Sequence, residues 1–424
     1  MVHLHERRAA FVVDRVVRYG THHTIPTNLL WYGSASLPTE RRADTYHKNR
    51  PHYFFFLRNH THSFVSSPPI LPLRFHPHNM WEAPPFESLT ATVRDASNPI
   101  GMRMRAAYFL RTVHANEVER QASVVAALSD GLTDKRHGSL MRHEFAYVMG
   151  QLRDERCCPV LEKTLQNESD CVMVRHEAAE ALGAIGASRS KPVLEQVRDD
   201  NDRVPELAET CQIAIDVMEW REKGGDPEEM PAACACMLNP YSSIDPAPPH
   251  PSHASKSMEQ LGDILCDATL PIFSRYRAMF SLRNIGGAEA VAQLCRTLTQ
   301  DTSSALLRHE VAYVLGQMQH PDSVEALEES LRRTNEHKMV RHESAEALGA
   351  IEGRWEDVER ILSEFKTDKD DVVRESCLVA LDAADYWGHT VQTDNAAEND
   401  PELLSFTAQK NQPNGVLANH FNVA

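Results

Sequence analysis

Residues 173–185 have the sequence MVRHEAAEALGAI, and residues 339–351 have the sequence MVRHESAEALGAI. The two stretches differ at one of 13 positions, so the chain contains an internal duplication. The triplet Arg-His-Glu occurs four times in the chain, and its copies begin at Arg142, Arg175, Arg308 and Arg341. A step of 33 residues separates the first two copies, and the same step separates the last two. A repeat of this length is typical of one helix-turn-helix unit.

The repeated unit has the pattern apolar-Arg-His-Glu-x-Ala-x-x-x-apolar-Gly, which is typical of a HEAT-type repeat. The chain lacks the Thr-Pro-Leu-His signature of ankyrin repeats and the Trp/Tyr pattern of tetratricopeptide repeats. One such unit cannot bury its apolar face alone, so neighbouring units must stack. We therefore predict an all-α HEAT-repeat α-solenoid with two pseudo-symmetric half-domains, each of about four helical hairpins, joined by a Pro-rich linker.

The helical pattern divides the chain into five segments. We expect the two HEAT-repeat halves at residues 86–221 and 258–388, because apolar residues recur there at helical spacing. Residues 222–257 contain the run Asp-Pro-Ala-Pro-Pro-His-Pro, which cannot continue a helix and predicts a linker. Residues 1–85 lack a sustained helical period and are predicted to be a disordered extension, and residues 389–424 to be a flexible tail.

Composition limits the classes of function. The 424 residues are 42% apolar and 7% aromatic, a mix that suits stacked helices, and no run of 18 apolar residues predicts a membrane span. The net charge of −16 argues against nucleic acid as a partner and favours either plain solubility or a cationic substrate. Nine cysteines without zinc-finger or disulfide spacing indicate a reduced protein. We expect a cytoplasmic monomer, with a nuclear presence also compatible.

Each Arg-His-Glu histidine lies on a helix face that carries only small side chains. Around His143, bulky apolar residues fall on the opposite side, while Ala146 and Gly150 share the histidine's face. The other three helices repeat this pattern: His176 with Ala179 and Gly183, His309 with Ala312 and Gly316, and His342 with Ala345 and Gly349. A face without bulk leaves room for another backbone, a metal or a substrate chain.

Four His-Glu pairs at matched repeat positions predict a metal site. An isolated pair is usually a surface ion pair, but four equivalent pairs, two in each half, favour a metal. The absence of thiolates argues against structural zinc or an iron–sulfur cluster, whereas imidazole with carboxylate suits iron, manganese or a dinuclear hydrolase. Two His and one Glu per metal make the facial set of non-haem Fe(II) oxygenases, and the duplication supplies this set twice. Adjacent His and Glu can meet at one metal that lies between neighbouring units.

The whole arrangement resembles the deoxyhypusine hydroxylase family. The resemblance rests on the four motifs in a duplicated HEAT array, on the linker sequence NPYSSIDPAPP at 239–249, and on YRAMF at 276–280. It covers about residues 88–386. It implies an enzyme that hydroxylates the deoxyhypusine side chain of translation initiation factor 5A to hypusine, using O2 at a non-haem di-iron centre. The implied cofactors are two Fe2+ ions, with O2 or peroxide bridging them.

The resemblance also implies roles for the eight motif residues. One iron would be held by His143, His176 and Glu177, the second by His309, His342 and Glu343, and the substrate by Glu144 and Glu310. The residues alone do not distinguish Glu144 from Glu177 as a ligand. A single common pocket requires the two halves to face each other, and we predict that they do.

Other residues and functions remain open from sequence. Tyr147 and Tyr313 either line the site or pack, and Glu180 and Glu346 either orient the imidazoles or lie on the helix surface. The four motif arginines either balance the acidic cluster or set the geometry of loops. Two alternative functions are a dinuclear metal-dependent hydrolase, which O2 consumption would exclude, and a HEAT scaffold that binds a basic protein, which bound iron would argue against.

Overall fold

The computed structural model describes residues 84–201, 203–226 and 235–393, with side chains up to residue 383. This part of the chain contains sixteen α-helices and no β-strand, which confirms the all-α prediction. The first eight helices are α2 (Phe86–Arg94), α3 (Ile100–Asn116), α4 (Gln121–Thr133), α5 (Gly138–Leu152), α6 (Cys158–Gln166), α7 (Val172–Ile185), α8 (Lys191–Asp200) and α9 (Pro205–Glu222). The second eight are α10 (Met258–Cys266), α11 (Ile272–Ile285), α12 (Gly287–Gln300), α13 (Ala305–Met318), α14 (Val324–Arg332), α15 (Lys338–Ala350), α16 (Trp355–Phe365) and α17 (Asp371–Thr393).

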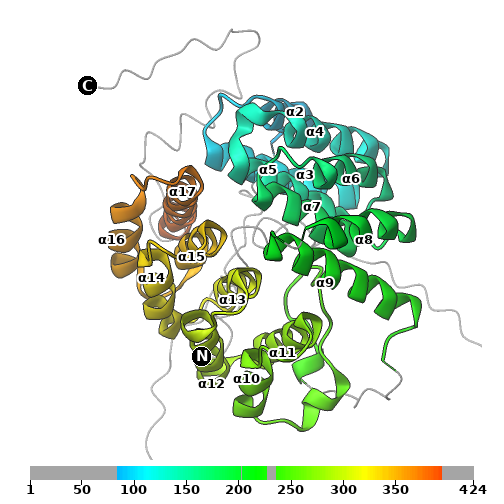
Figure 1. Cartoon of the computed structure of the whole chain (residues 1–424). Helices are drawn as coiled ribbons and strands as arrows, with labels where there is room; N and C mark the ends of the chain where they lie inside the picture. Colours follow the sequence, from blue (N-terminus) through cyan, green and yellow to red (C-terminus); the bar gives the residue numbers. More distant parts are fainter. Residues whose placement is uncertain (1–83, 202, 227–234, 394–424) are drawn as a thin grey trace, which may run out of the picture. The chain divides into compact units, whose positions relative to one another are not determined.

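These helices form four hairpins in each half, as predicted, and the halves are coloured blue to green and green to red in Figure 1. The predicted extension at 1–85 lies outside the described residues except for 84 and 85, and so does the predicted tail beyond Thr393, where α17 ends. Between the halves, the described linker residues form only two short 3-10 turns, Ala235–Met237 and Pro251–Ser255. No helix in the described ranges combines the length and the apolar character needed to cross a bilayer.

The second helix of each hairpin is an inner helix, and the inner helices that carry the motifs are buried over most of their circumference. In α7, 12 of the 14 residues are buried, whereas the outer helix α14 buries 5 of its 9 residues on one face. A helix that is enclosed on all sides needs apolar or small residues around its whole circumference. The inner helices contact one another in chain order, and α17 also contacts α3, so the contacts between inner helices form a closed ring. An ion pair between Arg105 and Asp382 joins the two ends of this ring.

The small residues on the histidine faces allow close approach of backbones. A Cβ added at Gly150 would lie 2.8 Å from the Cα of Ala181 on the next inner helix. The same relation recurs between Gly183 and Ala214, at 2.9 Å, and between Gly349 and Ala380, also at 2.9 Å. The sequence left open whether a backbone, a metal or a substrate chain lies against the motif glycines. At three of the four positions, Gly150, Gly183 and Gly349, it is a neighbouring backbone, so these inner helices pack closely.

The motif arginines set the geometry of helix ends and loops. Nε of Arg142, Arg175 and Arg341 donates to the carbonyl oxygen of a leucine ten positions earlier, at the end of the preceding outer helix. Such carbonyls lack partners within their own helix. Arg142 also pairs with Asp170 at 2.6 Å, and Arg341 pairs with Asp368 at 2.6 Å, both in the loop of the following hairpin. These buried arginines therefore lock one hairpin to the next and stay away from the acidic cluster.

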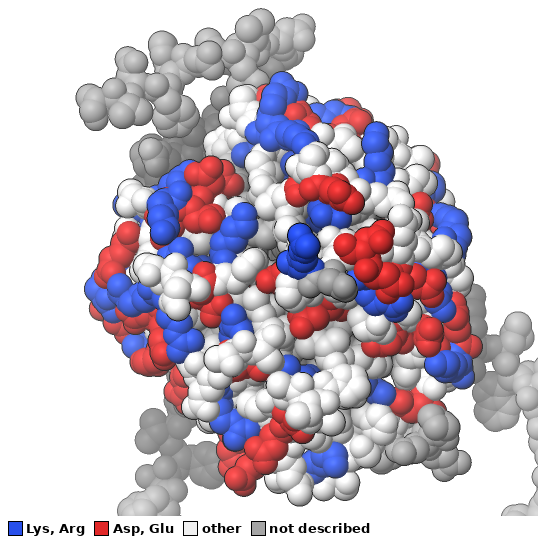
Figure 2. Space-filling view, viewed as in Figure 1, with Lys and Arg blue, Asp and Glu red and all other residues white. Residues whose placement is uncertain are grey.

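Charged side chains of both signs alternate over the visible face in Figure 2. The excess of 60 acidic over 44 basic residues does not gather into one patch on that face. The eight cysteines within the described residues are all free.

Candidate metal centre

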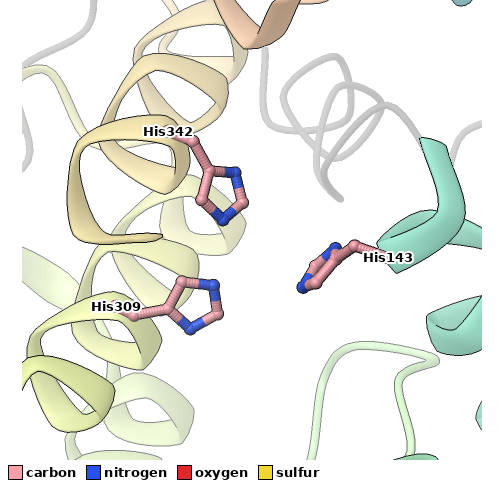
Figure 3. Close-up of side chains that lie close together, drawn as sticks. All are labelled: His143, His309 and His342. Carbon is pink, nitrogen blue, oxygen red and sulfur yellow. The ribbon is translucent and has the colours of Figure 1, made fainter. Parts of the chain in front are cut away.

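Four imidazoles meet at the centre of the ring of inner helices. His143 comes from α5, His176 from α7, His309 from α13 and His342 from α15. Ring centroids lie 5.3 Å apart within each half, for His143 with His176 and for His309 with His342. Across the halves, His143 lies 5.4 Å from His342, and His176 lies 5.3 Å from His309. Figure 3 shows His143 pointing towards His309 and His342 from the opposite side. The prediction that the halves face each other around one pocket is therefore confirmed.

The glutamates of the second and fourth motifs, Glu177 and Glu343, reach the histidine of the preceding repeat. Glu177 Oε2 lies 3.1 Å from His143 Nε2, and Glu343 Oε2 lies 3.4 Å from His309 Nε2 and 3.9 Å from His342 Nε2. His143, His176 and Glu177 offer three ligand atoms within 4.8 Å of one another, which is one of the two predicted ligand sets. His143, His309 and His342 form a second group of this kind that joins the halves. Convergence between neighbouring units, which the helical positions suggested, is thus found.

The residues present fit a bound metal. In the described residues, both ring nitrogens of His176 and of His309, Nε2 of His143 and of His342, and Oε1 of Glu343 are buried without a hydrogen bond. Nε2 of His143 and of His309 face only a glutamate oxygen, at 3.1 and 3.4 Å, and make no hydrogen bond with it. A buried polar atom without a partner normally costs about 1–3 kcal/mol. Seven such atoms in one place are consistent with a site that a cation completes, and their imidazole and carboxylate chemistry suits iron.

Burial and mutual repulsion keep three of the four imidazoles neutral. Burial first, and then the charge of His143, lowers the pKa of His176 and of His309 well below the usual value, and burial also lowers that of His342. Neutral imidazole is the form that binds a metal. Burial also disfavours a charged His143, but the carboxylates of Glu177 and Glu144 outweigh it and raise its pKa well above the usual value. The centre therefore attracts positive charge.

Two of the imidazoles, His143 and His309, line a pocket that is partly open to solvent. Six glutamates line it: the predicted Glu144, Glu177, Glu310 and Glu343, together with Glu180 and Glu346. Burial first, and then the charges of neighbouring carboxylates, raises the pKa of Glu310 and of Glu343 well above the usual value and that of Glu180 and of Glu346 to about 8. So many buried acidic groups are suited to hold cationic ligands.

Glu144 and Glu310, which come from equivalent positions, have different surroundings. The hydroxyl of Tyr108 donates a hydrogen bond to Oε2 of Glu144, and Oε1 of Glu144 lies 3.1 Å from His143 Nδ1. No hydrogen bond or ion pair from the described residues reaches the carboxylate of Glu310. Both side chains are almost completely buried, and both line the pocket rather than the surface.

Tyr147 and Tyr313, for which the sequence allowed either packing or a place in the site, line the pocket. Their hydroxyls lie 3.0 Å apart and connect the two halves across the pocket. Tyr108, which also lines the pocket, was missed, because its helix carries no His-Glu motif. The sequence held one signal for Tyr108: α11 repeats the sequence of α3, and Phe280 takes the position of Tyr108 in that repeat.

The linker contributes to the pocket as well, and no site role was predicted for it. Residues 243–246 line the pocket. The backbone N–H of Ile244 donates to Oε1 of Gln151 at 2.8 Å, and Nε2 of Gln317 donates to Oγ of Ser243 at 3.1 Å. Gln151 and Gln317 occupy equivalent positions in the two halves, so the linker crosses between them. The polar residues of its NPYSSID stretch were the signal that could have suggested this.

The fold and the site together define a HEAT-repeat protein with a buried histidine–carboxylate cluster that can hold a metal. A family model described as HEAT repeats matches residues 125–210, 259–336 and 307–382. The chain is 43% identical to the deoxyhypusine hydroxylase of Dictyostelium discoideum over 302 residues, which are 71% of this chain and 89% of that protein. It is 45% identical to the Rattus norvegicus deoxyhypusine hydroxylase over 300 residues, which are 71% of this chain and 91% of that protein.

A solved structure agrees with these relatives. The structure of human deoxyhypusine hydroxylase in complex with glycerol matches with a TM-score of 0.62 and 41% sequence identity, over 71% of this chain and 96% of that chain. The chain belongs to the deoxyhypusine hydroxylase family.

Proposed function

We propose that this chain is an iron-dependent monooxygenase that hydroxylates the deoxyhypusine side chain of translation initiation factor 5A to hypusine. The observation that carries the proposal is the meeting of four His-Glu pairs in one buried cluster, where six of the eight ring nitrogens lack a hydrogen bond. Membership of the deoxyhypusine hydroxylase family supports the reaction, since the relatives are 43–45% identical over most of their length. The protein substrate and its modified lysine come from this family resemblance.

The proposed cofactor is a pair of iron ions. His143, His176 and Glu177 would hold one ion, and the equivalent residues His309, His342 and Glu343 would hold the other. Two imidazoles and one carboxylate leave open positions on each iron, and bound iron would supply the redox chemistry that inserts an oxygen atom from O2 into a C–H bond. The short distance between imidazoles of different halves supports a common site for both ions.

The remaining carboxylates would bind the substrate chain. Deoxyhypusine is a lysine extended by an aminobutyl group, so it carries two amines that are protonated at neutral pH. Glu144 and Glu310 would accept charge-assisted hydrogen bonds from these amines and fix the chain between them. The hydroxyl of Tyr108 holds the carboxylate of Glu144 in place, and the nearly complete burial of both glutamates keeps bulk water from competing. Positioning of this kind selects which carbon is oxidised.

The direct test is incubation of the iron-loaded full chain with the deoxyhypusine form of the factor, followed by mass spectrometry. We expect one added oxygen per modified lysine when O2 and a reductant are present, and none without O2. A hydrolytic product, or turnover that continues without O2, would favour the alternative hydrolase.

The division of roles has its own test. Glu144→Ala should keep the iron content of wild type but bind substrate more weakly, whereas Glu177→Ala should lose iron. The two residues are a matched pair, because both are buried glutamates that directly follow a motif histidine. Loss of iron from Glu144→Ala would show that the assignment of Glu144 to the substrate is wrong.

A further inference from the structure

The repeated halves give the pocket an approximate two-fold symmetry, but deoxyhypusine has no symmetry. Its secondary amine lies within the chain, and its primary amine lies at the end. From α5 and α13 onwards, equivalent residues are separated by 166 positions, such as Glu180 with Glu346, which line the pocket, and Thr210 with Ser376. A symmetric pocket would accept the chain in either direction, so the residues at which the symmetry is broken decide its orientation.

One acidic side of the pocket already has donors from the protein. Glu346 Oε1 accepts a hydrogen bond from Ser376 Oγ at 2.8 Å and lies 3.6 Å from His342 Nδ1. Glu144 follows His143, whose ring lies 5.4 Å from that of His342, and it accepts a hydrogen bond from the Tyr108 hydroxyl. Each of these two carboxylates therefore already accepts a hydrogen bond from the protein.

The opposite side lacks these donors. The hydroxyl of Thr210, which is equivalent to Ser376, donates to the carbonyl of Glu206 at 2.7 Å and not to Glu180. Phe280 replaces Tyr108 in the repeat of α3 in α11, where the offset is 172 positions, and it has no hydroxyl. Within the described residues, no hydrogen bond or ion pair reaches the carboxylate of Glu180 or of Glu310. Both line the pocket, and Glu310 is only 3% exposed. Glu180 is also the carboxylate whose charge acts most strongly on Glu310.

We propose that Glu180, together with Glu310, binds the terminal primary ammonium of deoxyhypusine, and that its counterpart Glu346 does not. A primary ammonium has three N–H donors and can serve two carboxylates that have no other partner. The secondary ammonium has two N–H donors and matches the partly satisfied Glu144. Asp245 also lines the pocket. Its two carboxylate oxygens accept hydrogen bonds from the guanidinium of Arg283 at 2.8 and 2.6 Å, so its charge is already balanced and it does not need the substrate ammonium. This inference rests on the proposed function for the identity of the substrate.

The test compares two peptides that share the sequence around the modified lysine. One carries deoxyhypusine, and the other carries N-butyl-lysine, which lacks only the terminal amine. Their affinities for the iron-loaded full chain are measured by calorimetry without O2, so that no turnover occurs. Wild type should prefer the deoxyhypusine peptide by about 10- to 100-fold, the range expected for a hydrogen bond to a charged group.

Glu180→Gln should remove most of this preference, and Glu346→Gln, the matched control, should keep it. Equal binding of both peptides by wild type would overturn the proposal. So would a preference that survives in Glu180→Gln, or one that falls equally in both variants. Glu310→Gln gives a second test if Glu180→Gln does not fold by circular dichroism, and it should lose the preference too. Failure of the proposed function would appear separately, as wild type that adds no oxygen when O2 is supplied.

Discussion

Replacing Gly150 with alanine should separate two of the four helices that carry the metal site. The added Cβ would lie 2.8 Å from Cα and 3.0 Å from Cβ of Ala181 on α7. The first is a backbone atom, and the second is bonded directly to it. Carbon atoms in ordinary contact are about 3.5–4.0 Å apart. Neither atom can turn away, so α5 and α7 must move apart by roughly 0.5–1 Å.

The energetic cost follows from this geometry. Overpacking of a filled interior costs about 1–3 kcal/mol, and the better helix propensity of alanine returns up to about 1 kcal/mol. We therefore expect a net loss of about 1–2 kcal/mol and a melting temperature lower by several degrees, since about 1 kcal/mol corresponds to 2–4 °C in proteins of 150–250 residues. His143 and His176 would separate as well, and a misplacement of about 1 Å in an active site can lower activity about 100-fold.

The assay combines thermal unfolding, iron content and turnover for Gly150→Ala and for a control, Gly262→Ala. Gly262 also lies inside a helix, but a Cβ there would meet the ends of the Gln293 and Arg296 side chains, which can rotate away. The control should be as stable as wild type or slightly more stable. If Gly150→Ala matches the control in stability and keeps full iron content, close backbone approach does not set the spacing of the ligand helices.

Three further outcomes are expected. His309→Ala should lower the iron content of the purified chain by about half, because each ion needs all of its ligands. An unchanged iron content, measured by mass spectrometry, would contradict the ligand assignment. Removing the metal with a chelator should lower the free energy of unfolding, measured by calorimetry. The loss should be about 2.7 kcal/mol if free metal had been present at 100 times its dissociation constant. An unchanged transition would mean that the metal is not part of the folded core. Burial first, and then the charges of His250 and Arg277, lowers the pKa of His253 to about 4. As pH falls from about 6.5 to 4, the unfolded chain should therefore bind a proton at this histidine before the folded chain does, and the free energy of unfolding should fall by up to about 3 kcal/mol. His253→Gln should lack this pH-dependent loss. An identical pH profile for wild type and variant would refute the prediction.

The repeat architecture and the motif residues of the site could be predicted from the sequence. The triplets recur with a fixed step, and in a helix a fixed step places equivalent side chains at equivalent positions. The metal chemistry followed from the residue types, because four imidazoles and four carboxylates without thiolates favour only a few metals. The role of Arg142 was left open, because a buried arginine serves equally well beside an acidic cluster or at the end of a helix.

Contacts between residues far apart in the chain depended on the tertiary structure. The pairing of Tyr147 with Tyr313, and the position of linker residues 243–244 between two equivalent glutamines, follow from how the inner helices close into a ring. Small displacements at each helix–helix interface add up around that ring, and no single motif specifies their sum. The chemical groups of the site were thus determined by the sequence itself. Their distances, and the unequal surroundings of Glu144 and Glu310, were decided only by the packing of all the helices together.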